Sequence, residues 1–453
     1  MFSLLRLRCG SKKILLTMKI AFDVKIAVLG GGLAGTAFAY EASRRGFSVT
    51  LVEKEERLGG LLRSENIDGY VFDAGGSHIL FSRDQRRMRF FLGLLGNKVV
   101  RHRRDARVYF EGKYVKYPFE NGLYMLSPDF RYRALRDLLN KYIKHRCGEA
   151  ENVSNFEEWI YATFGETIAD SYLIPYNRKL WKRDLKQISL EWVGNRVPNP
   201  PLDDLLKTAV GINTEGYLHQ LNFVYPRVGG IQELVNAFES RLRNNGNVEL
   251  RLGQRVDAID PRTKTIVLSN GETLKYDRVV SSLPLPEAAR IAGLRSFPHL
   301  DYNSLIVVGI GLRDTRLPRY HWVYFPDEET IFHRIAFLSN YSPFMAPRNG
   351  ANIIAEITVP PSERPDPEKS VQKTIEGLEA VGLIRGDRVE VAKAWFWKYG
   401  YIVYDRNYSE NVKRAKRELR DVGIITIGRF GLWSYLNMDD VVFSSFEAAR
   451  ALR

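Results

Sequence analysis

The sequence has few cysteines and no long apolar run. Its 453 residues include two cysteines, Cys9 and Cys147. Two are too few for a disulfide framework, and neither lies in the Cys-x-x-Cys spacing of a thiolate metal site. This usage is typical of a reducing compartment and predicts a cytoplasmic protein. Zinc-finger spacing is absent, so we predict no metal site. No stretch of about 18 uncharged apolar residues occurs, so we predict no integral membrane segment.

The chain is also short of acidic residues relative to basic ones. It has 67 Lys+Arg against 53 Asp+Glu, a formal net charge of +14. This excess favours an anionic partner: nucleic acid, an acidic membrane surface or a phosphorylated small molecule. An apolar content of 45% with 12% aromatic residues excludes a disordered or collagen-like chain. At roughly 150 residues per domain, the length predicts about three domains, or two with insertions.

The first residues read as an N-terminal extension over 1–23. Residues 1–22 contain five basic residues and no acidic one, which is similar to a transit peptide. The other interpretation is an upstream start codon before a native start at Met18, because a nucleotide-binding strand begins only seven residues later. Both interpretations place the folded chain after residue 23.

The strongest motif is a glycine-rich turn at the start of the folded chain. The apolar run Lys25–Leu29 predicts a buried parallel strand. It leads directly into Gly30–Gly35, a G-x-G-x-x-G match. A helix is predicted over 36–46, and a second strand, Ser48–Val52, ends at Glu53. Strand, turn, helix, second strand and acidic residue, in this order and spacing, predict a dinucleotide-binding βαβ unit.

Each part of this motif has a mechanical reason. Gly30 permits the tight turn, Gly32 lets the backbone approach a pyrophosphate, and Gly35 allows close helix packing. The helix N-terminus offers unpaired N–H groups to phosphate oxygens. Glu53 can accept hydrogen bonds from ribose hydroxyls. The predicted cofactor-binding residues here are Gly30, Gly32, Leu33, Ala34, Gly35, Glu53 and Lys54.

The segments that follow favour FAD over NAD. Residues Arg57–Ser64 resemble the second glycine signature of FAD-dependent amine oxidases and their relatives, and they add Gly60, Leu61 and Arg63 to the predicted cofactor site. The turn Phe72–His78 can press its backbone on a flat ring. We predict that its last three residues, Gly76, Ser77 and His78, contact the flavin, with His78 near N5.

Two later segments complete the predicted flavin domain. Residues 248–282 read as several short strands, with an Asn270–Gly271 turn between two of them. By resemblance, Val256 makes a backbone contact near the adenine. Residues Gly423–Arg429 read as a strand that ends at a glycine, and a helix is predicted from about Met438. This region adds Gly428, Arg429, Met438 and Asp439 to the cofactor-binding candidates.

The middle of the chain contains further ordered motifs, and from about Lys25 onward the sequence resembles the UDP-galactopyranose mutases. The motifs that carry the resemblance are Tyr117–Asn121, Pro175–Trp181, Trp192–Val197, His321–Pro326, Phe332–Arg334, Ser339–Pro343, Gly400–Tyr401 and Gly428–Tyr435, followed by Met438–Asp439. The resemblance implies a nucleotide-sugar substrate, UDP-galactose. Its diphosphate can accept paired hydrogen bonds from arginine guanidinium groups and single ones from tyrosine hydroxyls. The exact sugar and nucleotide stay open.

The resemblance also implies roles for individual residues. Arg196 and Arg334 match the two arginines that straddle the diphosphate, and we predict both as catalytic, together with His78. Phosphate-contacting tyrosines match Tyr324, Tyr401 and Tyr435. The remaining substrate-side candidates are Arg104, Tyr117, Phe119, Asn177 and Trp181.

By the same resemblance, the enzyme is an isomerase with no net redox change. Reduced FAD acts through N5 as the nucleophile toward the anomeric carbon, and the arginine pair holds the departing UDP. NAD(P)H is a candidate electron donor that would have to use the same cleft. An oligomer is left open.

Two alternatives remain. An FAD-dependent oxidase or desaturase of the amine oxidase and protoporphyrinogen oxidase class shares the glycine signatures. Paired arginines and tyrosines, however, do not suit a site for an amine or a hydrocarbon. A basic nucleic-acid-binding or membrane-binding protein would explain the net charge but not the flavin site. The basic segment Tyr132–Arg146 could touch a membrane, although a solvated charged face also explains it. We predict no nucleic-acid partner.

The predicted fold class is α/β. An FAD-binding Rossmann-like domain of the two-glycine-signature (GR2) type is expected from 24–97, 226–300 and 420–453. A mostly antiparallel sheet domain is expected from 98–121 and 301–419. A mainly helical insertion is expected over 122–225, and the active site should lie where the three meet.

Overall fold

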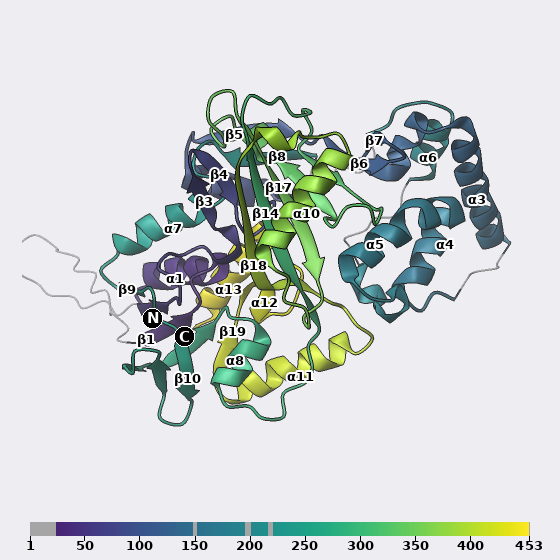
Figure 1. Cartoon of the computed structure of the whole chain (residues 1–453). Coiled ribbons are helices and arrows are strands. Elements are labelled where there is room, and N and C mark those ends of the chain that lie inside the picture. The colour runs from purple at the N-terminus through teal and green to yellow at the C-terminus, as the bar shows by residue number, and fades with distance from the viewer. Residues whose placement is uncertain (1–23, 148–151, 195–200, 216–220, 453) are drawn as a thin grey trace, which may run out of the picture.

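The computed structural model describes residues 24–147, 152–194, 201–215 and 221–452. The predicted N-terminal extension and Arg196 lie outside the described residues. The chain folds around two large sheets with a helical lobe to one side (Figure 1). In the described part, no helix has both the length and the apolar composition needed to cross a bilayer.

The first sheet has five parallel strands, and strands from distant parts of the sequence build it. Its order is β19–β13–β1–β2–β9. The strands are β1 (Lys25–Leu29), β2 (Ser48–Val52), β9 (Val248–Arg251), β13 (Arg278–Ser281) and β19 (Ile424–Thr426). Residues of β1 alternate between two hydrophobic cores: Ile26 and Val28 pack on one side, and Ala27 and Leu29 on the other. Burial on both faces explains the unbroken apolar run.

Helices cover this sheet, and the first of them begins at the glycine-rich turn. They are α1 (Leu33–Arg44), α2 (Gln85–Leu95), α7 (Glu233–Arg243), α8 (Leu285–Ile291), α11 (Tyr408–Asp421), α12 (Gly428–Gly431) and α13 (Met438–Ala451). Helix α1 begins three residues before the predicted start, because Gly32 serves as its N-cap. The turn needs glycine at two positions. Gly30 has φ +94°, and a Cβ on Gly35 would lie 1.9 Å from the Gly30 carbonyl oxygen.

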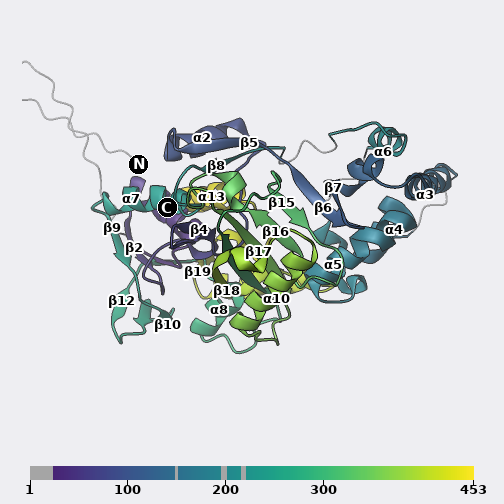
Figure 2. The same cartoon turned by 45° about the horizontal axis from the view of Figure 1, so that its top comes forward.

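The second sheet has seven strands in the order β18–β14–β17–β16–β15–β6–β7 (Figure 2). Every pair is antiparallel except β6 and β15. The strands are β6 (Ala106–Phe110), β7 (Lys113–Lys116), β14 (Tyr302–Leu312), β15 (Trp322–Tyr324), β16 (Arg334–Phe337), β17 (Ala351–Val359) and β18 (Val389–Ile402). Helix α10 (Pro367–Ala380) packs on this sheet, and a short helix α9 (Leu338–Tyr341) follows β16.

Three small sheets complete the body. One is the middle of the predicted series of short strands, formed by β10 (Val256–Asp260), β11 (Thr265–Leu268) and β12 (Thr273–Lys275), whereas the first and last strands of that series, β9 and β13, belong to the parallel sheet. The others pair β3 (Ser64–Ile67) with β4 (Tyr70–Asp73), and β5 (Val99–Arg103) with β8 (Asn222–Pro226).

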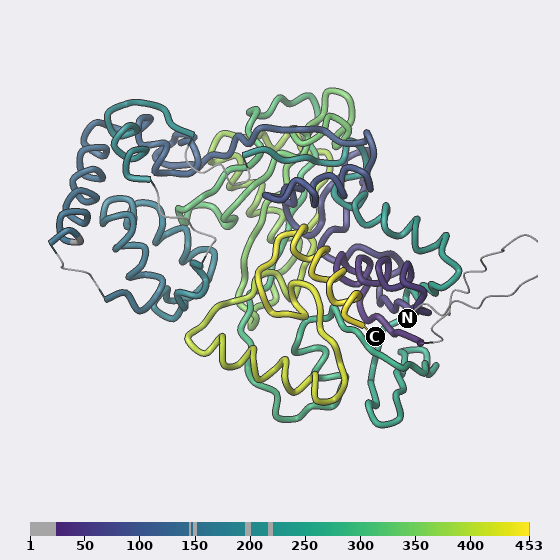
Figure 3. Tube along the Cα trace, turned by 180° about the vertical axis from the view of Figure 1, so that it is seen from behind, coloured from purple at the N-terminus to yellow at the C-terminus, as the bar shows by residue number. Residues whose placement is uncertain are grey.

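The helical lobe has a core of its own. It contains α3 (Pro128–Arg146), α4 (Phe156–Ile168), α5 (Ile174–Trp181) and α6 (Leu202–Ala209), and it projects from the side of the body (Figure 3). Asp137 of α3 ties α3 to α4 by accepting hydrogen bonds from the Thr167 amide at 2.9 Å and the Thr167 hydroxyl at 2.6 Å. The fold class is α/β, as predicted. The division into three units at the stated boundaries stays a prediction.

Candidate active site

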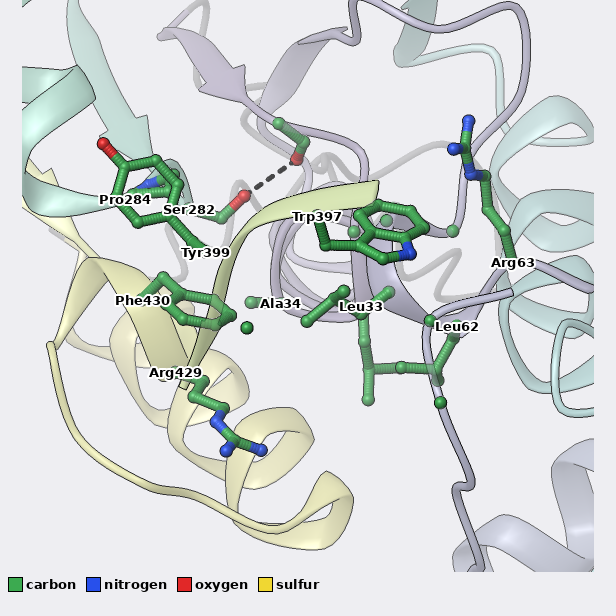
Figure 4. A pocket seen from close by; sticks show the side chains of 18 of the residues that line it. Leu33, Ala34, Leu62, Arg63, Ser282, Pro284, Trp397, Tyr399, Arg429 and Phe430 are labelled. Carbon is green, nitrogen blue, oxygen red and sulfur yellow. Dashed lines mark hydrogen bonds between the residues drawn. The ribbon is translucent and has the colours of Figure 1, made fainter. Parts of the chain in front are cut away.

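A cavity of about 850 Å³ extends from the glycine-rich turn of the parallel sheet to the face of the seven-stranded sheet. The β1–α1 turn, the Gly59–Arg63 turn, β10, α8 and the start of α13 line one part of it. Strands β15, β17 and β18 and the Gly75–His78 turn line the other. Figure 4 shows labelled side chains from the start of α1, the Gly59–Arg63 turn, the segment between β13 and α8, β18 and α12 around the same space. We call the two parts the glycine end and the strand end.

The glycine end presents two helix N-termini to the cavity. Leu33 and Ala34 begin α1, and Met438 begins α13; all three line the cavity. Neither N-cap residue makes a side-chain capping bond. A Cβ built on Gly32 would meet nothing closer than 4.0 Å, so there is room beside its backbone. Uncapped N–H groups beside open space are suited to phosphate oxygens.

Glu53 lies at the end of β2 with both carboxylate oxygens directed to backbone amides. Its Oε2 accepts from the Gly31 amide at 2.6 Å, and its Oε1 accepts from the Glu55 amide at 3.0 Å. A carboxylate oxygen has two lone pairs, so each oxygen can accept a further hydrogen bond from a hydroxyl group. Glu53 lines the cavity, and this geometry fits a ribose beside it.

Two arginines at the cavity have donors without an acceptor. The Nε atoms of Arg63 and Arg429 are buried and have no hydrogen-bond partner among the described residues. Arg63 pairs with Glu55 through Nη1 at 2.8 Å. Arg429 has no ion pair in the described part, and its guanidinium lies 3.7 Å from the ring centroid of Tyr435. The two side chains come from opposite sides of the view in Figure 4. Unpaired buried donors are costly unless a ligand accepts from them.

The strand end is organised by Glu356, which is 1% exposed in the middle of β17. Arg334 on the neighbouring strand β16 donates to it from Nε at 3.0 Å and from Nη2 at 2.6 Å. Burial raises the pKa of Glu356, but the charge of Arg334 and the hydrogen bonds from Arg334 and the Ser77 amide together outweigh it, and the net pKa lies below the usual value. Both groups are therefore ionised, and they form a buried charge-assisted pair.

Three further groups converge on Glu356. The Ser77 amide donates to Oε1 at 2.9 Å, and the Tyr401 hydroxyl donates to Oε2 at 3.1 Å. His333 Nε2 lies 3.9 Å from Oε2. Burial lowers the pKa of His333 to about 3, so its imidazole is neutral at neutral pH. The turn that carries Ser77 is thereby joined to three strands of the second sheet through one carboxylate.

His78 follows in the same turn and lines the cavity. Burial lowers its pKa to about 4, so the ring is neutral. Its Nδ1 lies 2.8 Å from the Gly76 carbonyl oxygen. A carbonyl can only accept, so Nδ1 carries the proton and Nε2 has the lone pair.

Tyrosines surround the rest of the strand end. Tyr324, Tyr401 and Tyr435 line the cavity. Tyr117 packs its ring 5.0 Å from that of Tyr324, and Arg104 lies 5.4 Å from the ring centroid of Tyr117. These two predicted residues thus border the cavity through Tyr324 without lining it.

Most of the predicted site residues come together at this cavity. Those that line it are Gly30, Gly32, Leu33, Ala34, Glu53, Lys54, Gly60, Leu61, Arg63, Gly76, Ser77, His78, Val256, Tyr324, Arg334, Tyr401, Arg429, Tyr435 and Met438. Gly35 and Gly428 pack against backbone and Ala34 instead. Asp439 accepts from Ser82 Oγ at 2.7 Å.

Three predicted substrate residues lie in the helical lobe. Phe119, Asn177 and Trp181 are buried, and in the described structure none of them lines the cavity. Phe119 stacks on Tyr172, and Asn177 donates to the Leu173 carbonyl at 2.8 Å. Trp181 packs edge-on against Trp192 at 4.7 Å. In this structure they are packing residues, and their proposed substrate contacts stay a prediction.

The sequence analysis missed several lining residues. Glu356 is the most important, and it left a signal: it is the one charged residue in the nine-residue apolar run Ala351–Val359. A buried carboxylate in such a strand requires a cationic partner. Trp397, Tyr399 and Phe430 also line the cavity, but nothing in their local sequence separates them from other aromatic residues.

Comparisons with known proteins agree with this geometry. The model of the flavin-containing amine oxidoreductase family matches residues 33–386, and the chain belongs to that family. A crystal structure of reduced UDP-galactopyranose mutase superposes with a TM-score of 0.86, at 27% identity over 94% of both chains. A putative protoporphyrinogen oxidase from Exiguobacterium sp. 255-15 shares the fold, with a TM-score of 0.71 and 16% identity over 94% of this chain and 98% of that one.

Similar curated sequences carry oxidoreductase names. A 4,4'-diapolycopen-4-al dehydrogenase of Metabacillus indicus is 22% identical over 64% of this chain and 62% of its own length. A 4,4'-diaponeurosporene oxygenase of Staphylococcus aureus (strain USA300) is 24% identical over 62% and 59%. The match thus spans less than two thirds of these relatives.

The protein is a flavoenzyme, and its cofactor is FAD. The cavity fits this cofactor. The uncapped starts of α1 and α13 and the buried Nε–H groups of Arg63 and Arg429 suit its pyrophosphate, and Glu53 suits its ribose. The turn from Gly76 to His78 lies where the cavity meets the second sheet, and it can hold the ring system.

Proposed function

We propose that the enzyme interconverts the pyranose and furanose forms of a UDP-sugar, with UDP-galactose as its substrate. The observation that carries this proposal is the buried Arg334–Glu356 pair with Tyr401 at the strand end of the cavity. The likeness to the reduced mutase over 94% of both chains supports it.

The strand end suits a polar, anionic substrate. Glu356 binds Nε and Nη2 of Arg334, and Nη1 has no hydrogen bond among the described residues. Nη1 can therefore donate to a phosphate oxygen while the guanidinium stays fixed in place. Arg429, whose guanidinium stacks 3.7 Å from the ring centroid of Tyr435, adds positive charge between the strand end and the cofactor site. Tyr324 and Tyr435 add hydroxyl donors.

The reaction then separates into a cofactor part and a protein part. Reduced flavin supplies the nucleophile toward the anomeric carbon. Arg334 and the tyrosines hold the departing diphosphate near that carbon, so that it can return after the sugar changes ring size. Neutral His78 offers an acceptor at Nε2 close to the same place. No net redox change is needed.

One anaerobic experiment tests the proposal. The flavin-loaded protein is reduced and offered UDP-galactopyranose and, separately, UDP-galactofuranose, with the oxidised protein as the matched control. We expect interconversion by the reduced protein and none by the oxidised one. Absence of interconversion in both states would overturn the proposal.

The second candidate is an FAD-dependent oxidoreductase. The dehydrogenase and oxygenase names of the curated relatives favour it, as do the aromatic side chains Trp397, Tyr399 and Phe430 along the cavity. It predicts oxygen-dependent turnover of an amine, a porphyrinogen or an apolar polyene, with no change in the UDP-sugars.

A further inference from the structure

Helix α3 lies at the outer edge of the helical lobe, on the side away from the two large sheets (Figures 1 and 2). It exposes a row of large apolar side chains. Tyr132 is 63% exposed, Leu139 38%, Tyr142 49% and Ile143 57%. Leu139 and Ile143 follow Tyr132 by seven and eleven residues, which is about two and three helical turns, so the three share one helix face. Tyr142 lies beside this face. The opposite face of α3 is already used, because Phe130, Ala134 and Leu138 lie in the lobe core.

Basic side chains flank this row. The helix has six lysines and arginines against two aspartates. Both aspartates already have partners within the chain: the exposed Asp129 pairs with Arg133 at 2.9 Å, and the buried Asp137 is bound to Thr167 and Arg136. Arg136, Lys144 and Arg146 are exposed. We call Tyr132, Leu139, Tyr142 and Ile143, with these three basic residues, the α3 outer face.

A second exposed apolar group borders α3. Leu206 at 36%, Val210 at 68% and Ile212 at 53% exposure lie on and just after α6, which packs beside α3. Arg131 of α3 approaches this segment at Gly211. Exposed apolar side chains among basic residues, which outnumber the acidic ones on α3 by six to two, mark an interaction site rather than an ordinary solvated face.

We propose that the α3 outer face docks on an anionic lipid bilayer surface. Tyrosine and aliphatic side chains between lysines and arginines are the composition of helices that lie in the membrane interface. The net charge of +14 adds long-range attraction to such a surface, and the cavity uses only a few of these cations. The helix lies in the plane of the bilayer, and the cavity stays outside it.

Charge also decides against the other occupants. In a two-fold symmetric dimer the same patch would face its own copy, and its basic residues would repel each other. Nucleic acid would pair with the cations but would leave Leu139 and Ile143 against a polar backbone. An anionic bilayer satisfies both parts of the face at once.

The test uses full-length, flavin-loaded protein and vesicle flotation. Vesicles are made of phosphatidylcholine alone or of equimolar phosphatidylcholine and phosphatidylglycerol. We expect binding to the anionic vesicles only, weakening as salt rises. The variant Tyr132→Ser/Leu139→Ser/Ile143→Ser should lower the partition coefficient at least about tenfold, because apolar burial in the interface is lost. Lys144→Glu/Arg146→Glu should lower it by a similar factor.

Helix α11 provides the matched control. It exposes Lys413, Arg417 and Arg420 without an exposed large apolar side chain in the described structure. Lys413→Glu/Arg417→Glu removes the same charge as the α3 variant, and we expect it to leave most of the binding. All variants are on the surface, so flavin content and unfolding temperature should stay unchanged.

A fluorescent label adds a local readout. Cys147 is exposed directly after α3, so an environment-sensitive dye placed there in a Cys9→Ser background should blue-shift on anionic vesicles. Three results would overturn the proposal: equal binding to both vesicle types, equal loss in the α3 and α11 charge variants, or a triple-serine variant that changes oligomeric state in light scattering while its vesicle binding is unchanged. The last would assign the face to a second copy of the chain.

Discussion

The two ends of the cavity are built by different means. The glycine end uses backbone: helix starts, a tight turn and one carboxylate that is itself held by backbone amides. The strand end uses side chains from β16, β17 and β18 that meet on one carboxylate. A backbone site is encoded over a short contiguous stretch, whereas a side-chain site depends on strand pairing. Substitutions at the glycine end should therefore destabilise the protein through steric clashes, whereas substitutions at the strand end should do so through unpaired charge.

The largest expected effect lies at the glycine end. Gly35→Ala places a methyl group 1.9 Å from the Gly30 carbonyl oxygen, and the turn has to move to accommodate it. We expect a loss of more than about 4 kcal/mol in the free energy of unfolding, together with loss of bound FAD, measured by denaturant unfolding and flavin absorbance.

Gly93→Ala is the matched control, because Gly93 also lies inside a helix but has nothing within 4 Å of a built Cβ. There alanine should stabilise by roughly 0.5–1 kcal/mol. If the two variants behaved alike, the steric account of the turn would be wrong.

At the strand end, Glu356→Gln should be the most damaging single change. It leaves the partly buried Arg334 charge without its counter-ion, which costs up to about 3–5 kcal/mol. Arg334→Met should cost a similar amount for the opposite reason. The double variant removes both charges, so we expect it to regain stability without regaining turnover of a UDP-sugar.

A double-mutant cycle measures this coupling. The exposed pair Arg385–Asp387 is the control, and Asp387→Asn there should cost less than about 1 kcal/mol. Additive losses at Arg334 and Glu356 would show that the buried pair is not one unit.

The sequence predicts the glycine end better than the strand end, because the first is encoded over a short stretch and the second depends on strand pairing. Strands β1 and β2 have the predicted bounds, and Glu53 lies at the cavity, because the βαβ unit is local and each residue type has a steric or hydrogen-bonding reason. At the strand end, Arg334 lines the cavity but Glu356 was missed, since its partner is fixed by the pairing of β16 with β17. Trp181 was expected beside the sugar and is buried in the lobe, because an aromatic residue gives the same signal in a core and in a site.

Acid should destabilise the seven-stranded sheet, because two neutral histidines are buried beside the starts of β15 and β16. Burial lowers the pKa of His321 to about 4 and that of His333 to about 3. A lowered pKa in the folded state means that the unfolded chain binds the proton first, so stability is full above about pH 6.5 and falls as the pH drops toward 4. Each histidine contributes a slope of up to about 1.4 kcal/mol per pH unit.

His321→Asn isolates one of these slopes. Asparagine keeps an acceptor for the Asp105 amide, which donates to His321 Nδ1 at 3.0 Å. Chemical unfolding at several pH values should give a shallower acid dependence in the variant. An unchanged dependence would mean that the neutral His321 ring is not a source of the acid sensitivity.

The smallest effect is expected from a Glu→Gln substitution at the glycine end, the counterpart of Glu356→Gln. Glu53→Gln keeps one acceptor oxygen, so one of the amides of Gly31 and Glu55 remains paired. Since the helix starts and turns that hold the cofactor are backbone, we expect FAD affinity to fall only about tenfold and the free energy of unfolding by about 1 kcal/mol. Titration of the apoprotein with FAD measures the first, and denaturant unfolding the second. The matched Glu→Gln pair therefore makes the comparison quantitative: if Glu53→Gln were as destabilising as Glu356→Gln, the glycine end would depend on its side-chain charge as much as the strand end does.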